Sequence, residues 1–439
     1  MIRSHRSTPF RTLAGLLVVF VLLSLSGCDY LKFVGQKRTL KNEFHNHPKM
    51  ELLRELSPEN CYTLFGELDH PKDYDGSFLV VGVSDRYQNR EIVAKRVVLS
   101  PALFYSVMVP EGDYDIYVFA DLNGDDLFRD DELVGRTTPG KPIPVGRKYA
   151  EDNILVKGPT LRLDLDHPQK ADFPLAVGGI TRKSRYASLD DEFFDPRYGT
   201  MGLYRPMELL AHTQGPFFQL EDYDPHKTLI LFVHGVEGTP QDWKYIVEGL
   251  DRKKFQPWFY FYPSGLPLEK LGNTLARSIM LLDQTPGYGI SNLIIVAHSM
   301  GGLVARAAID RLCRDGKPRY FRMYISFSSP YGGIEEAREG VKSAPAMVPC
   351  WIDVASDSEF LQRIYSTDLP KDVPFYLFFG YRNKSGASGD GTITLRSQLD
   401  DRIYVKAVKT YGFDATHVGI LNDASVRKVF NEILETVEP

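Results

Sequence analysis

From residue 226 onward, short runs that are wholly apolar alternate with longer stretches of helical periodicity. Wholly apolar runs predict strands buried on both faces, because a half-exposed strand alternates apolar with polar residues. The runs are Thr228 to Val233, Trp258 to Tyr262, Leu293 to Ala297, Met323 to Phe327 and Phe375 to Phe379. Between them, apolar residues recur at three and four positions, as at Leu268, Leu271 and Leu275. This order predicts an α/β domain over 226–439, with a mostly parallel sheet and helices on both faces.

The first 28 residues have the composition of an export signal. Arginines at positions 3, 6 and 11 precede an apolar run from Leu13 to Leu25, which is shorter than the roughly 20 residues that span a bilayer core. The sequence Leu25-Ser26-Gly27-Cys28 resembles the bacterial lipobox, and this resemblance implies cleavage after residue 27 and acylation of Cys28. We therefore expect a lipid-anchored protein of the bacterial cell envelope that faces the periplasm. The choice between inner and outer membrane stays open.

Three segments separate this signal from the α/β domain. Residues 28–58 are polar without sustained periodicity and predict a linker from the lipid anchor. Residues 59–165 contain short β-type runs divided by turn residues, which predict a small all-β sandwich. The runs are Phe78 to Val83, Ile92 to Leu99, Phe104 to Val109 and Tyr114 to Ala120. Residues 166–225 predict a connecting segment with edge strands at 202–206 and 215–221.

An acidic loop within the predicted sandwich has the spacing of a cation site. Asp121, Asn123, Asp125 and Glu132 occupy positions 1, 3, 5 and 12 of a loop that resembles an EF-hand calcium loop. Position 6 is Asp126, where glycine normally makes the sharp turn, and the flanking residues predict strands instead of helices. A structural calcium ion is one hypothesis, and an acidic hairpin turn with solvated carboxylates is the other.

Charge and cysteine content exclude some classes of protein. The net charge is −5 and no long Lys/Arg run occurs, so nucleic acid is not an expected partner. Apart from Cys28 the chain contains Cys61, Cys313 and Cys350, which allow one disulfide at most.

The segment from Asn292 to Leu303 carries the strongest chemical signal. A buried strand runs directly into an amphipathic helix through Ala297-His298-Ser299-Met300-Gly301-Gly302. Such a sharp turn presents a serine hydroxyl above the sheet and requires small neighbours, as in the G-x-S-x-G nucleophile turn. Here Ala297 replaces the first glycine. The pattern predicts Ser299 as a nucleophile, whereas a serine N-cap alone would not explain the two glycines.

The first strand of the domain ends in Val233-His234-Gly235-Val236, which leads to the same edge of the sheet. Hydrolysis of an ester builds negative charge on the carbonyl oxygen, and two backbone N–H groups aimed at that oxygen stabilise it. We assign these oxyanion-hole groups to Val236 and Met300. For His234 we predict a structural role in shaping the loop.

A general base and an acid should follow the nucleophile in the order Ser, Asp, His. His417 precedes the final predicted helix, which begins near Asp423, and it would take the Ser299 proton. Asp390 follows a late strand between two glycines and would orient the imidazole. The competing carboxylates for this role are Asp400, Asp401 and Asp414; the first two resemble an exposed turn, and the third is too near His417 in sequence.

Residues 226–439 resemble α/β-hydrolases of the lipase/esterase branch. The resemblance rests on Val-His-Gly-Val at 233–236, Ala-His-Ser-Met-Gly-Gly at 297–302, Ser-Ser-Pro-Tyr-Gly-Gly at 328–333, Gly-Asp-Gly-Thr at 389–392 and Thr-His-Val at 416–418. It implies the α/β-hydrolase fold and hydrolysis through an acyl-enzyme, with no cofactor required for catalysis. Residues 1–225 take nothing from it.

The expected substrate is a lipid or another acyl ester. Residues 331–372 contain apolar side chains among charged ones, and this pattern predicts either a lid over an acyl pocket or ordinary helical packing. Thioesterase, acyltransferase or amidase activity with the same triad is the alternative, because an acyl-enzyme does not reveal its acceptor. A further alternative is an inert hydrolase scaffold that acts as a tethered binding protein.

Overall fold

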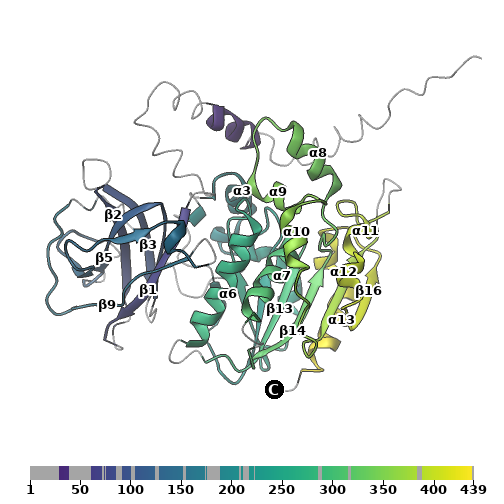
Figure 1. Cartoon of the computed structure of the whole chain (residues 1–439). Coiled ribbons are helices and arrows are strands. Elements are labelled where there is room, and N and C mark those ends of the chain that lie inside the picture. The colour runs from purple at the N-terminus through teal and green to yellow at the C-terminus, as the bar shows by residue number, and fades with distance from the viewer. Residues whose placement is uncertain are drawn as a thin grey trace, which may run out of the picture.

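The computed structural model forms two folded parts joined by a connecting segment (Figure 1). It describes residues 29–38, 61–71, 74, 76–85, 91–99, 104–123, 128–151, 155–173, 175, 188–206, 209–210, 217–221, 223–284, 289–314, 318–382 and 388–437. The predicted signal segment, 1–27, and Cys28 lie outside these ranges. Within them, no helix combines the length and apolar character needed to cross a membrane.

The second part is built on a seven-stranded sheet in which only the edge strand β10 is antiparallel. In spatial order the strands are β10 (Phe217–Gln219), β12 (Phe255–Tyr260), β11 (Thr228–Val233), β13 (Leu293–His298), β14 (Phe321–Phe327), β15 (Phe375–Gly380) and β16 (Lys409–Phe413). The five apolar runs correspond to β11, β12, β13, β14 and β15. Parallel strands share one carboxyl edge, so the segments that follow them are brought together there.

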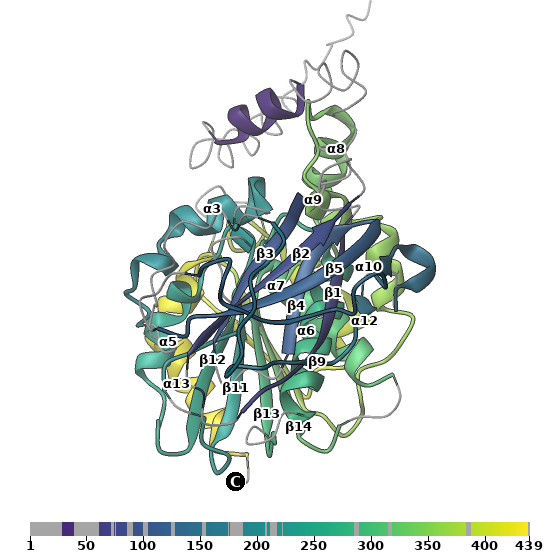
Figure 2. The same ribbon diagram turned by 90° about the vertical axis from the view of Figure 1, so that its left-hand side faces the viewer.

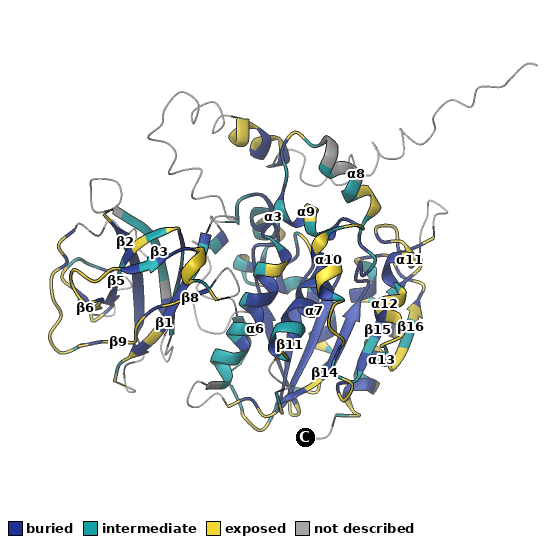
Figure 3. Cartoon of the chain, in the orientation of Figure 1, coloured by how far each residue is buried: buried dark blue, intermediate teal, exposed yellow. Residues whose placement is uncertain are grey.

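Helices cover both faces of this sheet because alternate side chains of each strand point to opposite faces. On one face, Leu231 and Ile295 pack in a cluster with α6 (Leu268–Gln284) and α7 (Met300–Leu312). On the other face, Phe232 and Val296 pack with α5 (Lys244–Glu248) and α13 (Ala424–Leu434). The central strands are buried throughout (Figure 3), as the wholly apolar runs predict.

Shorter helices cover the carboxyl edge and its flanks. They are α3 (Pro196–Tyr204), α8 (Glu335–Ser343), α9 (Pro349–Val354), α10 (Glu359–Ile364), α11 (Leu395–Gln398) and α12 (Asp401–Tyr404). The prediction of a strand at 202–206 is wrong, because Gly202 to Tyr204 form the last turn of α3. Asp195 caps this helix by accepting from Arg197 N–H, and Pro196 occupies its first turn. The predicted edge strand at 215–221 contains β10.

In the described residues before this part, the strands β1 to β9 form two sheets (Figure 2). One contains β1 (Cys61–Asp69), β4 (Phe104–Pro110), β8 (Leu155–Lys157) and β9 (Leu161–Arg162). The other contains β2 (Ser77–Ser84), β3 (Glu91–Leu99), β5 (Gly112–Ala120), β6 (Leu133–Arg136) and β7 (Ile143–Val145). Residues of both sheets, among them Leu64, Val80 and Ile116, share one apolar cluster. A second cluster includes Phe173, so the packing continues past the predicted boundary at residue 165.

The β-rich part contacts the second part, which contains the seven-stranded sheet, through α6. Lys270 Nζ donates to the backbone oxygen of Cys61 at 3.0 Å. The Arg277 guanidinium lies 4.6 Å from the centroid of the Phe65 ring, and Leu281 packs against Phe65 and Leu155. One helix therefore packs against the seven-stranded sheet with one face and against β1 and β8 with the other.

Residues 29–38 form a helix, which corrects the prediction of a linker for this stretch. Tyr30, Phe33 and Val34 lie on one face, since they are spaced by three and four residues, and they join the apolar cluster that packs on the seven-stranded sheet with α6 and α7. Ten residues are marginal as an isolated helix, so this tertiary contact accounts for its formation. The remainder of the predicted linker up to residue 60 lies outside the described residues.

The acidic loop is described only in part. Asp121 and Glu132 are buried, Asn123 is exposed, and Asp125 lies outside the described residues. Glu132 Oε2 accepts a hydrogen bond from Arg129 N at 2.9 Å, so one carboxylate oxygen already has a partner. In the described ranges no three His, Cys, Asp or Glu residues cluster as metal ligands. The calcium hypothesis stays a prediction.

No disulfide joins any two of the described cysteines Cys61, Cys313 and Cys350. The single disulfide that the sequence allowed among them is therefore not formed.

Candidate active site

Ser299 occupies the turn between β13 and α7 in a strained conformation. Its backbone has φ 54° and ψ −132°, a region that residues with a side chain rarely adopt. Two backbone hydrogen bonds hold the turn: Ser299 N donates to Phe327 O at 2.9 Å, and Gly302 N donates to Ser299 O at 2.9 Å. The strand-to-helix turn thus has the geometry that the sequence motif predicts.

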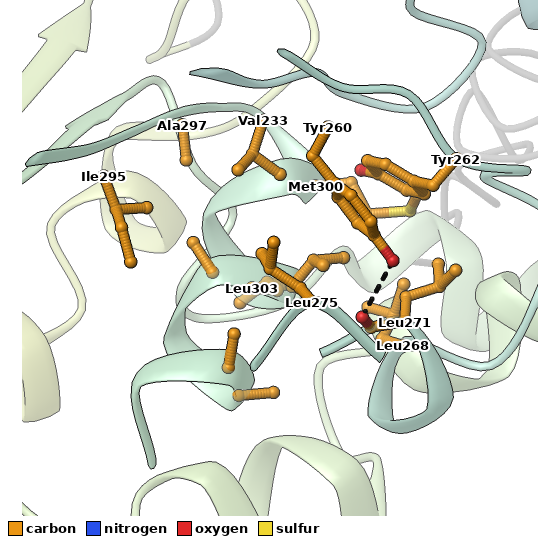
Figure 4. Packing of buried hydrophobic residues seen from close by; sticks show 14 of the residues in the cluster. Val233, Tyr260, Tyr262, Leu268, Leu271, Leu275, Ile295, Ala297, Met300 and Leu303 are labelled. Carbon is orange, nitrogen blue, oxygen red and sulfur yellow. Dashed lines mark hydrogen bonds between the residues drawn. The ribbon is translucent and has the colours of Figure 1, made fainter. Parts of the chain in front are cut away.

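The small residues around Ser299 are required by close backbone contacts. A Cβ atom on Gly301 would collide with the carbonyl oxygens of Val233 and His234, and one on Gly235 would lie 2.9 Å from Ser299 Cβ. The following residue, Met300, is buried with Leu303 against Leu271 and Leu275 of α6 (Figure 4). This packing fixes the first turn of α7, and with it the direction of the Ser299 side chain.

The structure brings Ser299, His417 and Asp390 together from three separate loops. His417 Nε2 lies 2.8 Å from Ser299 Oγ, and His417 Nδ1 lies 2.8 Å from Asp390 Oδ2. A carboxylate oxygen only accepts, so Nδ1 carries the proton and the Nε2 lone pair faces the serine hydroxyl. In this tautomer the imidazole can take the hydroxyl proton.

Asp390 is almost completely buried yet is stabilised as a carboxylate. Burial opposes its ionisation, but the hydrogen bond and charge of His417 and the N–H groups of Ile393 and Thr392 hold its pKa below the ordinary value. Those two N–H groups donate to Asp390 Oδ1 at 2.7 Å and 3.0 Å. The backbone N–H of His417 also donates to Asp390 O at 3.0 Å, which ties the two loops together.

The loop after β11 runs along the same carboxyl edge. Val236 and Met300, the predicted oxyanion-hole residues, lie in the segments that directly follow the adjacent parallel strands β11 and β13. In the described part of the chain, neither backbone N–H donates a hydrogen bond to another protein group. The assignment of the oxyanion hole to Val236 and Met300 stays a prediction.

His234 has both ring nitrogens engaged by the backbone. Nδ1 donates to Gly235 O at 2.8 Å, and Nε2 accepts from Tyr262 N at 3.2 Å. Burial lowers the pKa of His234 to about 4, so the ring is neutral near pH 7. These contacts agree with the predicted role of shaping the loop.

His298 is a site residue that the sequence motif contained but to which we assigned no role. Its Nε2–H donates to the backbone oxygen of His417 at 2.9 Å, and the two ring centroids are 4.8 Å apart. Burial, together with the neighbouring His417, lowers the pKa of His298 to about 3. The neutral His298 ring holds the His417 backbone beside the nucleophile; its position directly before the serine is the only signal in the sequence.

The competing carboxylates have other partners. Asp414 is exposed and forms an ion pair with Arg382 at 2.9 Å. Asp400 caps α12 and pairs with Arg402 at 2.7 Å, and Asp401 is exposed at the start of that helix. Of the four candidates, only Asp390 contacts His417.

Several solved structures are similar to about half of the chain at low sequence identity. A lipase from Bacillus licheniformis in its mature form is 18% identical with a TM-score of 0.40, over 50% of this chain and 97% of that chain. A lipase-esterase related protein from Clostridium acetobutylicum is 11% identical with a TM-score of 0.37, over 51% and 100%. An esterase from Pyrococcus furiosus is 13% identical with a TM-score of 0.35, over 50% and 84%.

No curated protein sequence matches the chain. A family model does match the segment that contains β11 to α10, including the loop of Val236 and the turn of Ser299. Over residues 224–363 the chain is similar to the family described as "Putative serine esterase (DUF676)".

Proposed function

We propose that this protein is a carboxylic ester hydrolase in which Ser299, His417 and Asp390 form a catalytic triad. The observation that carries the proposal is the pair of 2.8 Å contacts from His417, one to Ser299 Oγ and one to Asp390 Oδ2. The similarity of residues 224–363 to a serine esterase family supports the same reaction class.

Acylation begins with transfer of the Ser299 proton to His417 Nε2 as Oγ attacks the ester carbonyl carbon. The carbonyl oxygen becomes an anion that the N–H groups of Val236 and Met300 bind. Collapse of this intermediate breaks the bond to the alcohol oxygen, which receives the proton from His417. Asp390 holds the imidazole in the required tautomer and stabilises its protonated form.

Deacylation repeats these steps with water as the nucleophile. His417 accepts a proton from water as the hydroxide adds to the acyl-enzyme carbonyl, and it then returns that proton to Ser299 Oγ as the acid leaves. The two N–H groups stabilise the second oxyanion in the same way, and removal of one such donor typically costs about 2.7–4 kcal/mol in the barrier.

The anchor belongs to the same proposal. Cleavage before Cys28 and acylation of this residue would tether the hydrolase to a membrane of the cell envelope. The supporting observations are the basic start, the apolar run and the lipobox-like Leu25-Ser26-Gly27-Cys28. Mass spectrometry of the mature N-terminal peptide tests it: an unmodified Cys28 would contradict the anchor.

Hydrolysis of p-nitrophenyl esters of short and long acids tests the reaction. Ser299→Ala should lower kcat by up to about 10⁶-fold, as loss of a triad nucleophile does. Ser366→Ala changes an exposed serine and serves as the matched control, with an unchanged rate. Equal rates for wild type and Ser299→Ala would overturn the assignment.

A further inference from the structure

Helix 29–38 is held against the catalytic part by aromatic contacts. The Tyr30 ring lies 5.7 Å from Trp351 of α9 and 6.0 Å from Tyr204 of α3, and Phe33 lies 5.9 Å from Tyr204. Tyr30 Oη also donates to the backbone oxygen of Ala346 at 3.3 Å. The buried face of the helix is thus seated on α3, α9 and the segment that precedes α9.

The surface beneath this helix is connected to the active-site loops. In α3, Gly202 O accepts from Gly265 N at 3.0 Å, and Gly265 O accepts from Cys350 N of α9 at 3.3 Å. Ser264 Oγ, one residue earlier, accepts from Glu237 N at 3.1 Å, next to the oxyanion-hole residue Val236. Figures 1 and 2 place helix 29–38 at the same end of the molecule as α8 and α9.

Exposed apolar side chains occur on helix 29–38, on α9 and beside the catalytic residues. Leu31 on the outer face of the helix is 67% exposed and Ile352 of α9 is 49% exposed. Val236 and Val418, which neighbour the catalytic groups in sequence, are 36% and 60% exposed. Exposed large apolar side chains that lie together are characteristic of a surface that another apolar phase covers.

The charge of helix 29–38 and its position next to Cys28 in the sequence favour a lipid bilayer as this apolar phase. Helix 29–38 carries Lys32, Lys37 and Arg38 against a single carboxylate, Asp29, and all three cations are exposed. Clusters of exposed cations beside apolar side chains favour a bilayer with anionic lipids. Cys28, the proposed acylation site, directly precedes Asp29, the first residue of the helix, in the sequence.

We propose that helix 29–38 acts as an orienting anchor that holds the active-site edge against the membrane, so that the substrates are acyl esters of lipids in that same leaflet. This inference rests on the proposed ester hydrolase function and on acylation of Cys28. A docked helix differs from a flexible linker because it fixes which side of the hydrolase faces the bilayer and raises the local concentration of embedded esters at Ser299.

The test uses the full-length acylated protein reconstituted in vesicles of phosphatidylethanolamine and phosphatidylglycerol. Two rates are measured: hydrolysis of dissolved p-nitrophenyl butyrate, and hydrolysis of a fluorogenic long-chain phospholipid embedded in the same vesicles. The double variant Tyr30→Ala/Phe33→Ala removes the docking contacts and keeps Cys28. We expect the embedded-ester rate to fall about tenfold or more because orientation is lost, and the butyrate rate to stay within about twofold.

Gln36→Ala is the matched control, because Gln36 lies on the exposed face of the same helix, and it should leave the embedded-ester rate within about twofold. If the double variant loses both activities, Leu31→Asp decides, since this exposed position does not contribute to the core. A severalfold loss on the embedded ester alone supports the proposal, and unchanged rates on both esters overturn it.

The wild-type protein separates the two proposals. Hydrolysis of butyrate without hydrolysis of the embedded ester would overturn the orienting anchor and leave the ester hydrolase function standing. Hydrolysis of neither ester would overturn the hydrolase function itself, and the anchor proposal with it.

Discussion

The catalytic part and the β-rich part differ in where the backbone is strained. Glu237, Ser299 and Ser328 have positive φ angles of 54°, 54° and 47°. They lie in the segments that follow β11, β13 and β14, so all three are at the carboxyl edge of one sheet. Among the described residues of 61–173, no residue other than glycine has such a conformation.

This difference in backbone strain indicates that the two parts have different roles. A strained residue costs roughly 1–3 kcal/mol and persists only where the surrounding packing imposes it. In the β-rich part, regular strands pack around apolar clusters and no such cost arises in the described residues. At the carboxyl edge one of the three strained residues is Ser299, the proposed nucleophile, which indicates that packing there is used to position a reactive group.

Asp390→Asn should have the largest effect in the strained region. An amide at this position donates instead of accepting and favours the wrong imidazole tautomer, so kcat should fall about 10⁴-fold with the fold intact. Steady-state kinetics on a p-nitrophenyl ester measure it. Asp414→Asn is the matched control, because this carboxylate pairs with Arg382 at the surface, and a comparable loss in both variants would refute the assignment of Asp390.

Ile116→Ala should produce the opposite pattern in the β-rich part. Ile116 is fully buried in the cluster shared by the two sheets, so its truncation should cost about 2–5 kcal/mol of unfolding free energy. We expect kcat per folded molecule to stay unchanged. Chemical denaturation and active-site titration separate the two quantities, and a fall in kcat would show that the parts are coupled.

Asp242→Asn tests a half-buried carboxyl group in the 3₁₀ turn that follows the loop of Val236. Burial raises the pKa of Asp242 from 3.8 to about 6, so the folded chain holds a proton there that the unfolded chain has lost. Stability from this group therefore falls as pH rises through about 6. Asparagine stays neutral and can still accept from Thr239 N.

The variant should accordingly be more stable than wild type at pH 8, by at most about 3 kcal/mol, and similar to it near pH 4. Melting temperatures at the two pH values measure this. A stability difference that does not depend on pH would contradict the raised pKa.

Ser328→Gly should have the smallest effect. Glycine removes the strain of a φ of 47°, and it also removes a buried hydroxyl that has no hydrogen-bond partner among the described residues. We expect a gain of roughly 1 kcal/mol, seen as a modest rise in melting temperature. Val80→Ala in the β-rich part is the contrasting variant and should lower the melting temperature, since Val80 is fully buried in β2. A loss of stability in Ser328→Gly would show that the strain is offset by contacts of the hydroxyl.

Many of the strands and the Ser299 turn of the catalytic part could be predicted from local sequence. The run Thr228 to Val233 has the bounds of β11, and the strand, serine and paired glycines predict the turn at Ser299 because only small residues tolerate its contacts. Strand β16 was missed because it lies at the edge of the sheet and is partly exposed, so Lys409 and Thr410 give no apolar run. Helix α3 was missed although Asp195 and Pro196 form a start signal.

Taken by itself, the sequence determined which residues can perform the chemistry, their order along the chain and the strands that precede them. These three features depend only on local periodicity and on side-chain size. Only the tertiary structure decided that Asp390 rather than Asp414 contacts His417, that His298 supports the His417 backbone, and that helix 29–38 is seated on α3 and α9. Those contacts join residues far apart in the chain, and no local preference specifies them; they form because the sheet and its helices bury apolar surface together and thereby bring the loops of one edge into contact.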